Sequence, residues 1–106
     1  KIQIEIRNGC GVSNLARMCT DFLREQGLDV LDSKNADHFN YLETQILHHR
    51  GNLKRAKELA NILMIEDSKI IEDKNELLFY DLTLIIGKDY ITLPSYREAV
   101  LFQPPF

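Results

Sequence analysis

Strict alternation of apolar and polar residues opens the chain. The apolar positions are Ile2, Ile4 and Ile6, and the polar positions are Gln3, Glu5 and Arg7. Because successive side chains of a β-strand point to opposite faces, this pattern predicts a strand with the isoleucines on the buried face. The other face of the strand is expected to be open to solvent.

After a glycine-containing turn, the apolar spacing changes to that of an amphipathic helix. The positions at i, i+3, i+4, i+7 and i+8 are Leu15, Met18, Cys19, Phe22 and Leu23. We expect Ser13 to cap the start of this helix and Gly27 to end it in the left-handed conformation. Leu28 and Val30 begin a second strand, and a connection of this length predicts a parallel pair with a right-handed crossover.

The remainder of the chain alternates strands with a second helix. A polar loop at residues 33–42 leads to a predicted strand at residues 43–50. Asn52 is expected to cap the second helix, whose apolar stripe is Leu53, Ala56, Leu59, Ala60 and Leu63. Strands follow at residues 68–72 and 80–86, and the latter is apolar or β-branched on both faces, which predicts a central position.

The predicted order is therefore β-α-β-β-α-β-β. This order indicates an α/β fold, a two-layer sandwich in which two main helices pack on one face of a mixed β-sheet. Strand order stays open, with a ferredoxin-like arrangement as the nearest familiar topology. We divide the chain into a domain at residues 1–90 and a C-terminal tail at 91–106, with a short helix at 96–101 and an extended end. The predicted core includes Ile4, Leu15, Met18, Phe22, Leu59 and Leu84.

Length and charge narrow the class of protein. With 106 residues and 44% hydrophobic content, one domain with its own core is expected. The 13 basic and 16 acidic residues give a net charge of −3, which argues against a nucleic-acid partner. No apolar run approaches the ~20 residues of a membrane helix. Because the chain starts on a strand without Met, we expect a processed or excised domain, attached to a membrane only through a missing N-terminal anchor.

The two cysteines are predicted to be free thiols. Cys10 lies in the turn and Cys19 about two turns into the helix, so their Cα atoms should be roughly 9 Å or more apart. That separation exceeds the ~7 Å limit for a disulfide. Cys19 is interpreted as a small core residue. A reactive Cys10 at the helix N-terminus is the less favoured alternative.

The turn Asn8-Gly9-Cys10-Gly11 invites comparison with nucleotide-binding loops. A dinucleotide fingerprint requires a third glycine where Asn14 stands, and no Lys-Ser/Thr pair follows to make a P-loop. The glycines are better explained by a tight strand-to-helix turn. Free N–H groups at the helix start still attract anions, so Asn8, Gly9 and Gly11 are candidate binding residues.

No catalytic residues, metal site or cofactor are predicted. His48 and His49 are neighbours on a strand, so they point to opposite faces and cannot chelate one metal. The sequence offers no nucleophile-base pair or paired-carboxylate site. The domain is therefore expected not to be an enzyme.

Positive charge is concentrated at residues 48–57, HHRGNLKRAK, which contain no acid. Such a run is usually a solvated helix face. Here, however, the cations surround a helix N-terminus, where they oppose the dipole unless an anion lies nearby. An intrachain Asp or Glu is one candidate for that anion. The other is an external anionic ligand, with Arg50, Asn52, Lys54 and Arg55 as candidate binding residues.

A set of short motifs recurs in a characteristic order over residues 2–90. They are Asn8-Gly9-x-Gly11-Val12, Leu15-Ala16, Gly27-Leu28-Asp29-Val30, Asn35-Ala36-Asp37, Thr44, Ala56-x-x-Leu59-Ala60 and Gly87-x-Asp89. In this order and spacing the chain resembles the C-terminal domain of LytR/CpsA/Psr cell-envelope proteins. It departs from the pattern in having Cys10 between the glycines and Asn14 where glycine is common.

The resemblance implies a location outside the cytoplasmic membrane, in the periplasm or at the cell surface, usually after an N-terminal anchor. It implies no chemistry, because the phosphotransferase activity of that family belongs to a separate upstream domain. We therefore expect a non-catalytic accessory domain that binds cell-wall glycan, peptidoglycan or an anionic glycopolymer. The alternative is a protein-interaction domain that docks an envelope protein or itself through an exposed sheet face or through Phe102 and Phe106.

Overall fold

The computed structural model of the chain describes residues 2–75 and 77–101. Within this part, the strands are β1 (Gln3–Asn8), β2 (Asp29–Asn35), β3 (Gln45–His48), β4 (Ile70–Glu72) and β5 (Leu82–Ile86). The helices are α1 (Leu15–Glu25), α2 (Leu53–Leu63) and α3 (Pro94–Leu101), with short 3₁₀ turns at Asp67–Lys69 and Tyr90–Thr92. The α/β fold and the predicted order of elements are confirmed. Most strands are shorter than the apolar pattern indicates.

The five strands form one mixed sheet in the order β2-β1-β5-β3-β4. Strand β1 pairs in parallel with β2 and β5, while β3 is antiparallel to β5 and parallel to β4. The ferredoxin-like arrangement is therefore wrong. The strands of the β1-α1-β2 unit are neighbours in the sheet, and so are those of the β3-α2-β4 unit, with no other strand between them. Strand β5 lies between the two units and joins them.

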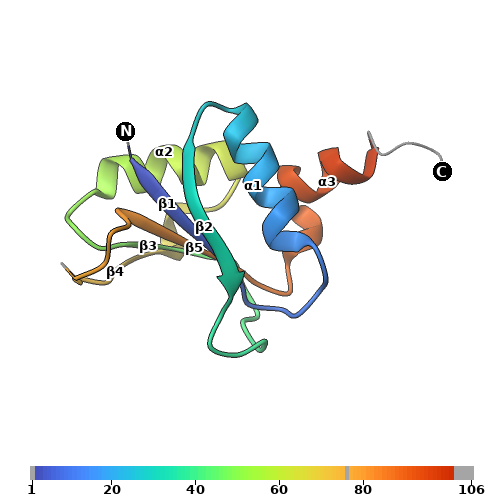
Figure 1. Cartoon of the computed structure of the whole chain (residues 1–106), viewed down its shortest axis with the longest axis horizontal. Coiled ribbons are helices and arrows are strands. Elements are labelled where there is room, and N and C mark those ends of the chain that lie inside the picture. The colour runs from blue at the N-terminus through green and yellow to red at the C-terminus, as the bar shows by residue number, and fades with distance from the viewer. Residues whose placement is uncertain (1, 76, 102–106) are drawn as a thin grey trace.

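Helices α1 and α2 lie on the same side of the sheet, as predicted (Figure 1). Helix α1 packs on β1 and β2, and α2 packs on β3 and β4. The two crossovers are β1-α1-β2 and β3-α2-β4, and their first strands, β1 and β3, run antiparallel to each other. The first crossover leads to one edge of the sheet and the second leads to the other edge. Two connections of the same hand must then cover the same face.

The core lies between this face and the two helices. Ile4, Leu15, Phe22, Leu59 and Leu84 are buried as predicted, and all five residues of β5 are buried. Met18 is only partly buried, although it packs against the core. The core is thus built from the apolar stripes that the sequence pattern indicates.

The opposite face of the sheet, which neither α1 nor α2 covers and which we call the open face, is less exposed to solvent at Glu5 than the sequence predicts. Glu5 was expected to be solvated, but it is 0% exposed. Its neighbours on this face include Thr83 of β5 and Lys34 of β2, and the latter forms an ion pair with it. Alternation identified the face on which Glu5 lies, but it carried no information about the side chains that cover it.

Both predicted N-caps need correction. Helix α1 is preceded by Asn14 in the left-handed conformation (φ 69°), and Ser13 is not its N-cap. Asn52 occupies the N-cap position of α2, but its side chain makes no capping bond. Gly27 has φ 84° after α1, as predicted for a left-handed terminating glycine.

The segment after residue 90 packs on the domain. Leu93 and Ser95 are buried, and α3 contacts α1. Tyr96 meets Tyr90 edge-on, with ring centroids 5.1 Å apart. The helix begins at Pro94 and ends at Leu101. The division of the chain at residue 90 stays a prediction, and Phe102 and Phe106 lie outside the described residues.

Candidate functional site

The glycine turn after β1 is held by the side chain of Asn8. Its Oδ1 accepts hydrogen bonds from the backbone N–H groups of Cys10 (3.1 Å) and Gly11 (3.0 Å). Its Nδ2 donates to the carbonyl of Val12 (2.7 Å). Because these turn amides already have a partner, Asn8 takes the place that an anion would take in a phosphate-binding loop.

The two glycines of the turn allow close packing. A Cβ at Gly9 would lie 2.7 Å from the ring of Tyr41 and 2.9 Å from the backbone of Ile86. Gly11 has φ 79°, and Phe39 packs directly against it. Gly9 and Gly11 are therefore required for this backbone geometry.

The loop that supplies these rings is ordered by its own contacts. Tyr41 stacks on His38 with ring centroids 4.2 Å apart, and its hydroxyl donates to Asp37 (2.7 Å). This hydrogen bond lowers the pKa of Asp37 and raises the pKa of Tyr41. The backbone N–H of Tyr41 also donates to the carbonyl of Gly9 (3.1 Å), so the loop is tied to the turn.

The predicted basic residues do not converge on one cleft. The guanidinium of Arg50 donates to the carbonyl of Leu78. Asn52 donates through Nδ2 to Asp81 (3.4 Å), so this predicted ligand already has an intrachain partner. Lys54 is exposed on the outer surface of α2 and has no ion-pair partner among the described residues. Of the four, only Lys54 is free of such contacts within the described ranges.

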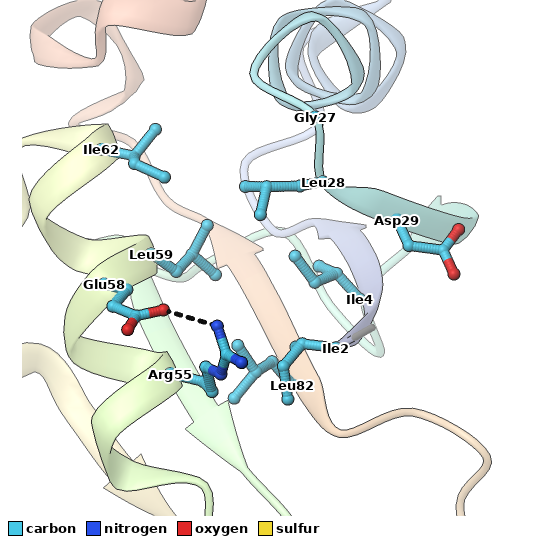
Figure 2. A pocket seen from close by; sticks show the side chains of 10 residues that line it. All are labelled: Ile2, Ile4, Gly27, Leu28, Asp29, Arg55, Glu58, Leu59, Ile62 and Leu82. Carbon is cyan, nitrogen blue, oxygen red and sulfur yellow. Dashed lines mark hydrogen bonds and ion pairs between the residues drawn. The ribbon is translucent and has the colours of Figure 1, made fainter.

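Arg55 lies at an apolar cleft between α2 and the start of β1. The cleft has a volume of about 340 Å³ and is bordered mainly by Ile2, Ile4, Leu28, Leu59, Ile62 and Leu82. Figure 2 shows Arg55 on α2 at the border of the cleft, joined to Glu58 by an ion pair. Its Nη1 lies 3.1 Å from Oε2 of Glu58, so an intrachain acid offsets its charge, as the simpler interpretation proposed.

A second hollow brings together basic residues that are distant in sequence. Its volume is about 430 Å³, and it is lined by His49, Arg50, Gly51 and Lys74. None of these lining residues is acidic. Lys74 was missed at the sequence level because it follows β4, 24 residues after Arg50, and nothing in its local pattern marks it.

Glu5 is at the centre of a buried polar network on the open face. Its Oε1 accepts hydrogen bonds from Nε of Arg7 (2.8 Å) and from the hydroxyl of Thr83 (3.1 Å). Nζ of Lys34 lies 3.0 Å from Oε2, in an ion pair without good hydrogen-bond alignment. Two cations and one hydroxyl thus compensate the burial of this carboxylate.

The network continues to His49 in an arrangement that resembles a hydrolase triad. Nε2 of His49 lies 2.7 Å from Oγ1 of Thr83, and Nδ1 lies 3.2 Å from Oδ2 of Asp73. Nδ1 also lies 2.9 Å from the carbonyl oxygen of Asp73. However, Thr83 is fully buried in the central strand, where no substrate can reach its hydroxyl. The arrangement joins β5, the residue that follows β3 and the β4–β5 loop, and it offers no nucleophile.

The thiols differ in their surroundings. Both are free, as predicted, and Cys19 is buried while Cys10 is partly exposed. Burial raises the pKa of Cys19 to about 12, and a contact with Ser95 opposes this rise. Sγ of Cys10 lies 3.5 Å from Oδ1 of Asn8. Cys19 is therefore a core residue without nucleophilic character.

Neither a metal site nor a membrane helix is found in the part of the chain that the structure describes. No three His, Cys, Asp or Glu side chains there are grouped to hold a metal ion. None of the described helices is long and apolar enough to cross a membrane.

Several motif residues connect the start of β3 to the end of β5. Asp89 accepts hydrogen bonds from the backbone N–H (3.0 Å) and the hydroxyl (2.7 Å) of Thr44. The N–H of Gly87 donates to the same hydroxyl (3.1 Å), and a Cβ at Gly87 would lie 2.5 Å from the backbone of Glu43. These motif residues hold β3 and β5 together and do not form a ligand site.

The fold is similar to a solved structure. The soluble domain of a conserved hypothetical secreted protein from Mycobacterium marinum aligns with a TM-score of 0.67 and 15% sequence identity. The alignment covers 88% of this chain and 63% of that chain, so this chain spans less than two thirds of the solved domain. At this identity the similarity establishes the fold alone.

Sequence comparison establishes the family. No curated protein shows significant similarity to the chain. The family model LytR_C, described as LytR cell envelope-related transcriptional attenuator, matches residues 1–90. Because this match includes most of the 106 residues, the chain belongs to the LytR_C family of accessory domains of cell-envelope proteins.

Proposed function

We propose that this accessory domain works outside the cytoplasmic membrane and binds an anionic cell-wall glycopolymer without catalysing a reaction. The observation that carries this proposal is the hollow lined by His49, Arg50, Gly51 and Lys74, in which none of the described lining residues is acidic although the chain has a net charge of −3. What we call the α2 basic surface consists of Arg50 and Lys74 of this hollow together with the exposed Lys54.

The cations on and beside this surface differ in how freely they can bind an external anion. Lys54 and Lys74 are exposed, and neither has an ion-pair partner among the described residues. Arg55 is paired with Glu58, which reduces its attraction for an external anion. Contacts made by exposed lysines are screened over a Debye length of ~8 Å at physiological salt, so modest affinity that falls with added salt is expected.

A non-catalytic role agrees with the chemistry of the buried groups. The histidine-hydroxyl-carboxylate arrangement of His49, Thr83 and Asp73 is closed to a substrate, because the Thr83 side chain is 0% exposed. The pKa of Cys19 is raised, so this thiol is a poor nucleophile. These groups support the packing of the domain and have no access to a substrate.

Docking of an envelope protein is a second candidate function. The β4–β5 loop exposes Leu77 and Phe79, which are 94% and 80% accessible. Arg50 donates to the carbonyl of Leu78 between them, so this apolar tip lies next to the α2 basic surface. A partner that buries Leu77 and Phe79 would use a different part of the molecule from an anionic polymer.

Amide-shift titration with soluble wall fragments tests the first proposal. The informative variant is Lys54→Glu/Lys74→Glu, because both side chains are exposed and the Arg55–Glu58 pair stays intact. The matched control is Lys88→Glu/Arg97→Glu, which makes the same change in net charge at exposed positions elsewhere.

Shifts centred on residues 48–57 and 74 are expected in the wild type and the control, and they should be lost in the informative variant. Equal binding by all three proteins would mean that these cations are only a solvated face. Shifts confined to residues 77–79 on addition of an envelope protein, with no response to wall fragments, would favour the docking function.

A further inference from the structure

A polar hollow at the carboxyl ends of β1 and β2 has no role in the proposal above. Its volume is about 490 Å³, and it lies between the glycine turn, the start of α1, the end of β2 and the β2–β3 loop. Neutral hydrogen-bonding side chains contribute much of its wall: Ser13, Asn14, Ser33 and Asn35. None of the residues that line it within the described part of the chain is acidic.

Two cations border the hollow, and they differ in availability. Lys34 is already paired with the buried carboxylate of Glu5 at 3.0 Å. Arg17 is exposed, and no acid within the described ranges forms an ion pair with it. The wall therefore presents one guanidinium that is free to form paired hydrogen bonds with a phosphate or carboxylate.

An aromatic ring completes the wall. Phe39 packs against Gly11 and keeps 43% of its surface exposed. The loop that carries it is tied to the turn, because Ala36 donates to the carbonyl of Asn8 (2.8 Å) and Tyr41 donates to that of Gly9 (3.1 Å). The ring is thus held in place before any ligand arrives, which lowers the entropy lost on binding.

This combination of groups matches one chemical class. Hydroxyl and amide side chains pair with sugar hydroxyls, an aromatic ring covers the apolar C–H face of a pyranose, and a guanidinium binds an acidic substituent. We propose that the hollow is a subsite for one phosphorylated or carboxylated sugar residue, with Arg17 on the acidic group and Phe39 against the ring. This inference rests on the proposed function, because it supplies the sugar-specific contact that the α2 basic surface lacks.

The first test is amide-shift titration of the wild-type chain with glucose 1-phosphate, glucose and inorganic phosphate. Glucose 1-phosphate should move the amides of residues 11–17, 33–35 and 39, and each fragment alone should move them less. Equal saturation by inorganic phosphate would reduce the site to an anion contact and overturn the sugar assignment. If glucose 1-phosphate moves only amides outside these residues, the sugar assignment is also wrong.

Variants separate the two contacts. Phe39→Leu keeps an apolar contact with Gly11 but removes the aromatic ring, and we expect affinity for glucose 1-phosphate to fall roughly threefold to tenfold. Arg17→Gln should weaken it by about tenfold, the usual scale of a charge-assisted hydrogen bond. Lys88→Gln, which removes an exposed cation elsewhere, is the matched control and should bind as the wild type does. Unchanged affinity in Phe39→Leu and Arg17→Gln would overturn the assignment.

Failure of this subsite and failure of the proposed function give different results. The Lys54→Glu/Lys74→Glu variant should retain glucose 1-phosphate binding at the hollow while it loses the wall-fragment shifts at residues 48–57 and 74. If glucose 1-phosphate does not act on the hollow but wall fragments still depend on Lys54 and Lys74, only the subsite is wrong. If the hollow binds glucose 1-phosphate, and wall fragments bind equally to the wild type and to Lys54→Glu/Lys74→Glu, the subsite is supported. The α2 basic surface is then not the binding site for wall fragments.

Discussion

Asn8 shows how one side chain decides whether a glycine turn is a ligand site. In a phosphate-binding loop the turn amides point at an anion, whereas here two of them donate to Oδ1 of Asn8. The sequence pattern is similar in both cases, since glycine is needed for the backbone geometry in either. The difference lies in a residue that precedes the glycines.

Thr83 illustrates a buried hydroxyl with two partners. Replacing Thr83 with Val keeps the shape but leaves His49 and Glu5 without the hydroxyl between them. We expect the free energy of unfolding to fall by roughly 1–3 kcal/mol, the cost of unpaired buried polar groups. Denaturant titration measures this change.

The control for this substitution is Thr83→Ser, which keeps the hydroxyl and removes only a methyl group. It should cost clearly less than Thr83→Val. If the Val variant is as stable as the wild type while the Ser variant is not, the hydroxyl does not connect the network as described.

The two thiols should differ in reactivity in the folded protein. Burial raises the pKa of Cys19 from the reference value of 9.0 to about 12, so at pH 8 a maleimide should label only Cys10. Both should react in denaturant. Rapid native labelling of Cys19, detected by mass spectrometry of the peptides, would contradict the burial described here.

The same shift makes stability depend on pH at the alkaline end. The folded state retains the Cys19 proton up to a higher pH than the unfolded state does. Its contribution to stability is therefore fully present below pH 9.0 and is lost as the pH rises toward about 12.

At the scale of elements, α3 packs on α1, and its Ser95 contacts Cys19, while Leu93 just before α3 is buried in the core. Removing residues 91–106 should lower the free energy of unfolding by about 2–5 kcal/mol, as expected for loss of one buried leucine. The native labelling rate of Cys19 should rise at the same time. Thermal unfolding and maleimide labelling measure the two effects.

Leu93→Ala is the companion variant, since it removes the buried side chain and keeps the chain length. If the shortened chain unfolds at the same temperature as the wild type and Cys19 stays protected, residues 1–90 are an independent unit and α3 only rests on the surface.

Most elements could be predicted because their signal is local. The alternation from Ile2 to Arg7 and the stripe from Leu15 to Leu23 each depend on neighbours within one strand or helix. The strand order could not be predicted, because it depends on β5 entering between two units that are complete before it in the chain. The identity of the sheet partners is a long-range property that periodicity does not encode.

The candidate sites were predicted less well than the fold, for the same reason. Arg50 was recognised from its basic neighbours, but Lys74 joins it only through the pairing of β4 with β3. Phe39 and Arg17 border one hollow because the β2–β3 loop returns to the glycine turn. A run of charged residues identifies only the part of a site that is contiguous in sequence. The residues that the fold brings to it from elsewhere in the chain cannot be identified from that run.

At the scale of the whole molecule, the two proposed contact regions lie toward opposite edges of one sheet. The α2 basic surface follows β3 and β4, and the polar hollow follows β1 and β2. The motif residues Thr44, Gly87 and Asp89 stabilise the sheet between them. A scaffold of this kind suits weak binding at several points along an extended polymer better than chemistry at a single centre.

In the proposed function, the α2 basic surface binds anionic polymer through the exposed side chains of Lys54 and Lys74. Fluorescence anisotropy of a labelled poly(glycerol phosphate) chain tests it most directly, with the wild type, Lys54→Glu/Lys74→Glu and Lys88→Glu/Arg97→Glu compared at low and physiological salt. We predict that the wild type and the control bind equally and weaken as salt rises, and that the Lys54→Glu/Lys74→Glu variant shows little binding at either salt concentration. Equal binding by all three proteins, or binding that does not respond to salt, would contradict the account.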